Sequence, residues 1–208
     1  NYFSSKNVNL NGTKNIVDNL NKYHKNLDWF FFSSTSHVYT HSKYKIAENK
    51  KINNYFSKYG KTKYLAEKYI NKKLNKKINY CIGRIFSFSH PNQDGSFFIP
   101  SILKKIRKEN KKTIIFRNVD HERDFISTKD ISKVINLLYL KKRRGIYNIG
   151  SGKCTNLIDI IRILCKRYNR NYKILYSRNS TKLVADISKL KKEGIKVSSN
   201  IRGILKLF

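Results

Sequence analysis

Hydrophobic positions along the chain follow two spacings, one typical of helices and one of buried strands. Apolar residues three or four positions apart predict helices over residues 10–25, 58–73, 99–107, 129–140 and 156–168. Apolar runs too short for a helix predict strands over residues 28–34, 79–86 and 113–116. Because strands and helices alternate, we expect an α/β layered fold with a parallel sheet, whose functional groups gather at the carboxyl ends of the strands.

The first and third predicted helices carry residues that are typical of helix starts. Asn9 and Asn11 are candidate amino-terminal caps for the helix over 10–25. Pro100 suits the first turn of the helix over 99–107, because an N–H lost at that position has no partner within the helix. A turn at His90-Pro91 separates this helix from the strand before it.

The high positive charge of the chain suggests a nucleic-acid partner, but the distribution of the basic residues does not support one. The 208 residues include 45 Lys and Arg against 13 Asp and Glu, a formal net charge of +32 that could neutralise phosphates of a nucleic acid. The basic residues run evenly from Lys6 to Lys206, and 34 Lys and 24 Asn against three Ala indicate a bias toward AT-rich codons. We therefore expect no nucleic-acid partner. We expect no membrane partner either, because no apolar run approaches the roughly 18 to 20 residues that span a bilayer.

Cysteine and histidine positions argue against disulfides and metals. Cys81, Cys154 and Cys165 are odd in number and widely spaced, and the five histidines show no ligand spacing. We therefore expect no metal and a cytoplasmic location. The sequence contains no methionine and begins without a charged segment followed by an apolar one, so we expect a fragment without a signal peptide.

Candidate chemistry begins with Tyr59 and Lys63, which lie four residues apart on one face of a predicted helix. A tyrosine with a pKa of about 10 can serve as an acid and base near neutral pH when a nearby cation favours its phenolate. The spacing alone does not identify a site. The sequence has five such pairs: Tyr2/Lys6, Tyr39/Lys43, Tyr59/Lys63, Tyr64/Lys68 and Tyr69/Lys73.

A hydroxyl-rich run sets the Tyr59 pair apart from the others. Ser33-Ser34-Thr35-Ser36-His37-Val38-Tyr39 follows a predicted strand, and its Thr35 precedes Tyr59 by 24 residues. With this run the sequence resembles the extended short-chain dehydrogenase/reductase family, which includes the nucleotide-sugar epimerases and dehydratases. Further matching motifs follow in the family's order: Asn9-Leu10-Asn11-Gly12-Thr13, Arg123-Asp124-Phe125-Ile126 with Asp130, Tyr147-Asn148-Ile149-Gly150-Ser151-Gly152, and Ala185-Asp186-Ile187-Ser188-Lys189.

The resemblance implies a Rossmann-like parallel sheet without its first βαβ unit, joined to a smaller C-terminal α/β substrate-binding lobe. Residues 1–88 would be the C-terminal part of the Rossmann dinucleotide-binding domain. Residues 89–208 would be mainly the substrate-binding lobe, with about 119–150 returning to the Rossmann domain. The family's Gly-x-x-Gly-x-x-Gly phosphate turn is absent from the printed sequence, so we expect the chain as printed to bind a dinucleotide poorly or not at all.

The resemblance also implies residue roles, a cofactor and an assembly. Tyr59 would exchange a proton with a sugar hydroxyl or ketone, and Thr35 would hydrogen-bond the same oxygen. Lys63 would hold the nicotinamide ribose of NAD or NADP and lower the pKa of Tyr59. The full-length protein would form a homodimer through the helices over 10–25 and 58–73. The remaining expected contacts are Asn9, Ser33 and Phe86 with the cofactor, Arg123 and Ser87 with the diphosphate of a nucleotide sugar, and Phe116 with its nucleotide base.

Departures from the family's pattern narrow the expected reaction. The sugar 4,6-dehydratases of this family carry an acidic residue where this sequence has His37, and the Asn expected near the diphosphate is Ser87. We therefore expect an NAD(P)-dependent 4-epimerase or 4-ketoreductase, with hydride transfer at C4 of the sugar. Three alternatives stay open: a 4,6-dehydratase, a noncatalytic regulator that binds a nucleotide sugar or RNA, and the product of a decayed gene.

Overall fold

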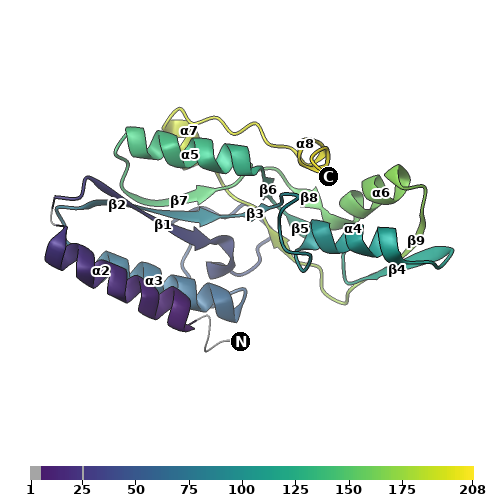
Figure 1. Ribbon diagram of the computed structural model, residues 1–208, viewed down its shortest axis with the longest axis horizontal. Coiled ribbons are helices and arrows are strands. Elements are labelled where there is room, and N and C mark those ends of the chain that lie inside the picture. Colours follow the sequence, from purple (N-terminus) through teal and green to yellow (C-terminus); the bar gives the residue numbers. More distant parts are fainter. Residues whose placement is uncertain (1–5, 25) are drawn as a thin grey trace.

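The computed structural model describes residues 6–24 and 26–208 and centres on a parallel sheet with the strand order β1–β2–β7. Its strands are β1 (Trp29–Thr35), β2 (Asn79–Ile85) and β7 (Gly145–Ile149). The helices around it are η1 (Asn7–Asn11), α2 (Gly12–Tyr23), α3 (Lys58–Lys73), α5 (Thr128–Leu140) and α7 (Ser188–Lys192). Helices α2 and α3 cover one face and α5 and α7 the other (Figure 1). These three layers confirm the predicted α/β fold with a parallel sheet.

Both faces of this sheet are buried, and adjacent residues of β2 serve different faces. Cys81 packs into the core with Val134 and Leu138 of α5, whereas Ile82 packs into the core with Ala66 and Ile70 of α3. This alternation follows from the period of two along a strand. A strand buried on both faces has an almost continuous apolar sequence, which is why 79–86 was recognisable as a strand.

A second lobe, with its own hydrophobic core, lies at the carboxyl ends of the sheet strands (Figure 1). It contains the parallel pair β4 (Thr113–Arg117) and β9 (Asn171–Leu175), with α4 (Phe98–Lys108), α6 (Leu157–Arg167) and α8 (Ile201–Leu205). Three short strands form a separate small sheet: β5 (Glu122–Arg123), β8 (Thr155–Asn156) and β10 (Lys182–Leu183).

The chain passes between the two lobes repeatedly. After β2 it enters the second lobe, returns to the sheet for α5 and β7, leaves again for α6 and β9, and then returns for α7 (Figure 1). At the junction, β3 (Ser87–Phe88) pairs in parallel with β6 (Phe125–Ile126). The domain boundaries expected at 88–89, with 119–150 returning, stay a prediction.

The first helix starts differently from the prediction. Asn11 has helical backbone angles (φ −69°, ψ −40°) and makes no side-chain capping bond, because η1 already precedes it as a turn of π-helix. The Gly12 N–H donates to the carbonyl of Asn7, so no free N–H is left there for a cap to accept. The predicted caps Asn9 and Asn11 are therefore wrong. The predicted end of this helix at Lys25 lies outside the described residues.

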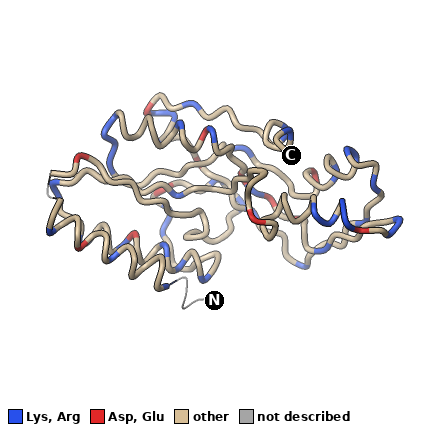
Figure 2. The backbone as a smooth tube through the Cα atoms, viewed as in Figure 1, with Lys and Arg blue, Asp and Glu red and all other residues tan. Residues whose placement is uncertain are grey.

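Two features bear on the expected nucleic-acid and membrane partners: the distribution of basic residues and the character of the helices. Lys and Arg are distributed over the helices and loops of both lobes (Figure 2). Within 6–24 and 26–208, none of the helices combines the length and the apolar character that crossing a bilayer requires.

Candidate functional site

A cleft of about 800 Å³ opens where the carboxyl ends of β1 and β2 meet the second lobe. Its walls come from the end of β1 and the turn η2 (Ser36–Val38) after it, the start of α3, the strand β3, the start of α4 and the strand β5. The loops that follow parallel strands meet at this edge, as expected for a functional site in such a sheet. Seven of the lining residues are Phe or Tyr, and the lining contains no Asp or Glu among the residues described.

Thr35 is the last residue of β1 and lines the cleft. Its Oγ1 accepts a hydrogen bond from the backbone N–H of His37, at 3.2 Å. Because a threonine hydroxyl can accept and donate at the same time, this bond leaves the proton of Thr35 free to donate to another oxygen. The expected donor therefore stands at the carboxyl end of a sheet strand.

Tyr59 and Lys63 occupy the first two turns of α3, which begins with Ser57 as a cap for the Gly60 N–H at 3.0 Å. Tyr59 is 43% exposed and lines the cleft. The Lys63 Nζ donates to the Ser33 carbonyl at 2.8 Å and lies 4.9 Å from the centre of the Phe32 ring. The lysine thus ties α3 to the end of β1.

The acid–base properties of this pair are shaped by burial. Burial raises the pKa of Tyr59 above its ordinary value, which is opposite to the effect expected from Lys63. Burial lowers the pKa of Lys63, and the negative charge of Glu67 opposes that change. In this structure Tyr59 is therefore a protonated phenol at neutral pH.

Gly60 allows α3 to approach the turn after β1 very closely. A Cβ at this position would lie 1.9 Å from the carbonyl oxygen of His37 and 2.4 Å from its carbonyl carbon. No side chain fits in that space. Gly60 is therefore what lets the helix of Tyr59 stand directly against the residues that follow Thr35.

His37 adds a titratable ring to the cleft. Its Nδ1 lies 3.2 Å from the Ser57 hydroxyl, and its ring packs against Phe56 and edge-on to Tyr59, with ring centres 4.8 Å and 6.3 Å apart. Burial, followed by the positive charge of Arg123, lowers the pKa of His37 below its ordinary value. The imidazole is therefore neutral at neutral pH.

Arg123 lines the cleft from β5, opposite the sheet. Its Nη1 donates to the carbonyls of Glu122 and Thr181 at 2.8 and 2.9 Å, and its Nη2 donates to the Thr181 hydroxyl at 2.9 Å. The guanidinium also stacks 5.2 Å from the centre of the Phe56 ring. A guanidinium has five N–H donors, so these bonds orient Arg123 and leave donors for a ligand.

The structure gathers most of the predicted residues at the cleft, but not all of them. Ser33, Ser87 and Phe86 line it, although Phe86 is only 2% exposed. Asn9 and Lys63 lie outside this lining. The Asn9 amide donates to the Thr62 hydroxyl at 3.2 Å, next to the Tyr59 turn of α3, and the Lys63 Nζ donates to the carbonyl of Ser33, which does line the cleft. Phe116 is also outside the lining. It is 2% exposed in the core of the second lobe, because the alternation of β4 turns it inward, and its predicted contact with a nucleotide base has no support from this position.

The sequence analysis missed a buried polar cluster behind the cleft. Glu67 and Arg84 form an ion pair at 2.6 Å, with their side chains 1% and 3% exposed. Two signals were present in the sequence: Arg84 interrupts an apolar strand, and Glu67 lies four residues after Lys63 on the same helix face.

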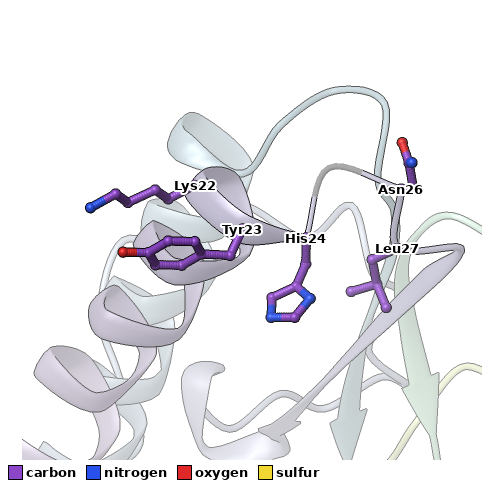
Figure 3. A pocket seen from close by; sticks show the side chains of 5 residues that line it. All are labelled: Lys22, Tyr23, His24, Asn26 and Leu27. Carbon is purple, nitrogen blue, oxygen red and sulfur yellow. The ribbon is translucent and has the colours of Figure 1, made fainter.

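A second hollow, of about 500 Å³, lies at the amino end of β1. Lys22, Tyr23, His24, Asn26 and Leu27 line it, and the side chains of His24 and Leu27 point toward each other (Figure 3). None of the predicted site residues belongs to it. Elsewhere in the described part of the chain, no three His, Cys, Asp or Glu side chains are grouped as a metal site would need.

Comparison with known proteins identifies a family and several relatives of this chain. The sequence model of the NAD dependent epimerase/dehydratase family matches residues 4–150. A putative UDP-glucose 4-epimerase of Methanocaldococcus jannaschii is 34% identical over 168 residues, which cover 76% of this chain and 52% of that protein. An ADP-L-glycero-D-manno-heptose-6-epimerase of Cupriavidus pinatubonensis is 27% identical over 143 residues, which cover 63% of this chain and 43% of that protein.

Solved structures with the same fold have much lower sequence identity. The structure of MoeE5 in complex with UDP-glucuronic acid and NAD has a TM-score of 0.82 at 18% identity, covering 96% of this chain and 69% of that chain. The UDP-glucose 4-epimerase of Thermotoga maritima with UDP-glucose has a TM-score of 0.79 at 21% identity, covering 97% of this chain and 68% of that chain. These similarities show the fold. The chain spans about half the length of the curated relatives it matches.

Proposed function

We propose that this chain, which belongs to the NAD dependent epimerase/dehydratase family, forms the catalytic part of an NAD(P)-dependent epimerase or ketoreductase that acts at C4 of a nucleotide-linked sugar. One observation carries the proposal: a hydroxyl donor, Thr35, and a phenol, Tyr59, line the same cleft. The helix of Tyr59 is bound to that strand through the ammonium of Lys63. The names of the relatives, UDP-glucose 4-epimerase and heptose 6-epimerase, support a nucleotide-sugar epimerase.

The residues of the cleft fit a nicotinamide cofactor, which when bound supplies the hydride chemistry of this family. Lys63 uses one of its three N–H donors for the Ser33 carbonyl, which leaves donors for the hydroxyls of a ribose. Ser33 and Phe86 line the cleft and would form its walls beside that ribose. Asn9 would act at one remove, through its bond to Thr62 on α3.

In this proposal Tyr59 moves the proton and Thr35 directs it. As a phenolate, Tyr59 would accept the proton of the C4 hydroxyl as that carbon becomes a ketone, and as a phenol it would return the proton when the ketone is reduced. The Thr35 hydroxyl would hydrogen-bond the same oxygen throughout. Since burial raises the pKa of Tyr59, the positive charges of Lys63 and of a bound nicotinamide are needed to bring the phenolate within reach near neutral pH. His37 is neutral and stands edge-on to Tyr59, where it contacts the sugar or relays a proton.

In this proposal Arg123 and Ser87, which both line the cleft, hold the diphosphate of the substrate. Arg123 is oriented by its bonds to Thr181, so its remaining N–H donors form a prepared site for a diphosphate. A planar cation with several donors suits phosphate oxygens better than a lysine does. Phe116 has no part in this arrangement.

The cleft favours an epimerase or a reductase over a 4,6-dehydratase. Elimination of water across C5 and C6 needs an acid and a base beside those carbons, and the described lining offers His37 but no carboxylate. We further propose a cytoplasmic homodimer that pairs through α2 and α3. Two exposed apolar residues on α2, Ile16 at 51% and Tyr23 at 62%, support the pairing. The free thiols of Cys81, Cys154 and Cys165 support the location.

Replacing Tyr59 with Phe in the full-length protein tests the proposal. Interconversion of UDP-glucose and UDP-galactose should fall by at least about 100-fold, the typical contribution of a general acid–base group, with no loss of folded structure. Tyr64→Phe is the matched control, because Tyr64 is a tyrosine of the same helix with a lysine four residues later that lies outside the cleft lining. Near-wild-type turnover of Tyr59→Phe would exclude the proposed mechanism. Salt-dependent RNA binding without sugar turnover would instead favour the regulator.

A further inference from the structure

Three strands of the main sheet carry polar residues at the same level, just below the cleft. Ser34 of β1 pairs in register with Arg84 of β2, which pairs with Asn148 of β7. All three are buried, at 4%, 2% and 0% exposure. Residues in register on parallel strands point to the same side of a sheet. Glu67 of α3 packs against this row from the helix side, with 1% exposure.

Glu67 is bound by both neighbouring strands. The Nη2 of Arg84 donates to its Oε2 at 2.6 Å, and the Nε of Arg84 donates to both carboxylate oxygens at 3.1 and 3.2 Å. The hydroxyl of Ser34 donates to its Oε1. One carboxylate therefore links a helix to β1 and β2 together.

The far end of Arg84 is satisfied as well. Its Nη1 donates to the Tyr39 hydroxyl at 2.8 Å and to the Glu48 carbonyl at 3.3 Å, and Tyr39 donates in turn to Asn148 at 2.7 Å. Burial raises the pKa of Tyr39 to about 12, so this hydroxyl keeps its proton. Buried ion pairs rarely stabilise a fold more than apolar residues of the same volume do. The position of the pair therefore points to a role beyond stability.

That position is directly behind the residues of the cleft. The Ser33 carbonyl accepts from Lys63, the Ser34 hydroxyl donates to Glu67, and Thr35 lines the cleft. Lys63 and Glu67 lie one helical turn apart on the same face of α3. Two successive turns of α3 are thus fastened to two successive residues of β1.

We propose that Glu67 is a positioning residue for Lys63: through Ser34 it fixes α3 along β1, one helical turn beyond the bond from Lys63 to the Ser33 carbonyl, and its buried negative charge lies on the same helix face as the Lys63 ammonium. The proposal rests on the proposed function only in that Lys63 is there the residue that holds the cofactor. Glu67 itself does not reach the cleft, because its side chain is 1% exposed and its carboxylate is bound by Ser34 and Arg84.

A test must separate the effect of the Glu67 charge on Lys63 from the effect of burial. Burial lowers the pKa of Lys63, and the negative charge of Glu67 opposes that change. Arg84 lies on the other side of Glu67 and partly screens that charge. Removal of the carboxylate charge should therefore make the ammonium easier to deprotonate, whereas removal of the Ser34 hydroxyl should not.

The test is the titration of Lys63 followed by its ¹³Cε NMR signal in the chain itself, with the signal assigned by its loss in Lys63→Arg. Glu67→Gln keeps the side-chain shape and removes the charge, so the Lys63 midpoint should fall. Glu193→Gln is the matched control, because it breaks the ion pair between Glu193 and Arg143, on the α7 side of the sheet. It should leave the Lys63 midpoint unchanged.

Two further variants keep the proposal open to refutation. Glu67→Gln leaves Arg84 buried without its partner and could unfold the chain, so the double variant Glu67→Gln with Arg84→Gln removes both charges together. Its Lys63 midpoint should also fall. Ser34→Ala should leave the midpoint in place and speed amide hydrogen exchange over residues 59–63.

The outcomes distinguish this inference from the proposed function. A Lys63 midpoint that stays at the wild-type value in folded Glu67 variants overturns the role of the charge, and so does an equal fall in Glu193→Gln. Unchanged amide exchange in Ser34→Ala overturns the fastening of α3. None of these measurements requires turnover or a cofactor, so an inactive protein would refute the proposed reaction without affecting this result.

Discussion

Replacing Gly60 with alanine should damage the site by separating the two elements that carry it. The added Cβ would lie 1.9 Å from the His37 carbonyl oxygen, whereas carbon and carbonyl oxygen ordinarily approach to about 3.3 Å. The contact must therefore open by about 1.4 Å. The obstructing atoms are backbone, so no side-chain rotation relieves the clash.

The expected loss exceeds the gain that alanine brings to a helix. Alanine in place of a helical glycine adds about 1 kcal/mol of stability where space allows. Overpacking typically costs about 1 to 3 kcal/mol, and here the capping bond from the Gly60 N–H to Ser57 is strained as well. We expect a net fall of about 2 kcal/mol in the free energy of unfolding, or about 4 to 8 °C in Tm for a chain of this size.

The assay is urea unfolding followed by circular dichroism, with Gly12→Ala as the control. Gly12 also begins a helix, but a Cβ there meets only the Asn7 carbonyl oxygen, at 3.9 Å. The control should therefore be stabilised by up to about 1 kcal/mol while Gly60→Ala is destabilised. In the full-length protein, a displacement of this size between Thr35 and Tyr59 should also lower kcat by about 100-fold.

Equal stability of the two alanine variants would refute the reasoning. It would mean that the turn after β1 gives way without cost and that the close contact at Gly60 does not set the position of α3. Full activity in a destabilised Gly60→Ala would refute the second half, because the distance between Thr35 and Tyr59 would then not matter.

Two further predictions concern buried titratable groups. The Asp124 carboxylate accepts hydrogen bonds from the backbone N–H groups of Ser151 and Gly152, at 2.7 and 2.8 Å. Asp124→Asn turns an N–H toward these donors, so it should lower the free energy of unfolding by about 1 to 3 kcal/mol. An unchanged midpoint in urea unfolding would contradict this. Because the pKa of His37 is lowered in the folded state, the unfolded chain binds its proton first as the pH falls below about 6.5. The wild type should therefore lose more stability than His37→Gln between pH 7.5 and 5.5, and equal losses in urea unfolding would show that His37 is not buried as described.

Local sequence patterns predicted the larger elements well. The helix over 58–73 has the predicted bounds, because Ser57 caps its start and Ala66 and Ile70 repeat at helical spacing toward the sheet. The strand predicted over 28–34 is shifted by one residue at both ends, and the strand predicted over 79–86 ends one residue earlier. Continuous apolar runs identify strands that are buried on both faces.

Among the strands that were not predicted, β7 and β9 are the longest, and their local signal is weak. β7 is only five residues long and begins after Arg143-Arg144, with Gly145 at φ 93° turning the chain into the sheet. β9 is a half-exposed edge strand with the sequence Asn-Tyr-Lys-Ile-Leu. Both strands are specified by pairing with partners far away in the sequence, and periodicity within a short window does not contain that information.

The site shows the same division between local and distant information. The order of the motifs was enough to predict that Thr35, Tyr59 and Arg123 belong to one site, and all three line the same cleft. Their roles stay predictions. Phe116 lies in the core of the second lobe, outside the cleft lining. An aromatic residue of a strand can face either a cleft or a core, and its own sequence does not show which. Arg84 and Glu67 were missed because charged residues are usually on the surface, and their pairing joins a strand to a helix.

The repeated passage of the chain between the lobes has a consequence for how this protein forms. Neither lobe is built from one continuous stretch, since β7 joins the sheet only after α4, β4 and β6 have been made. Contacts between distant parts of a chain must wait for long loops to close, so such topologies fold slowly. As the ribosome releases the chain, the sheet stays incomplete until residue 149 emerges, and the cleft until Thr181 is available to orient Arg123. The binding surface is therefore among the last parts of the molecule to take shape.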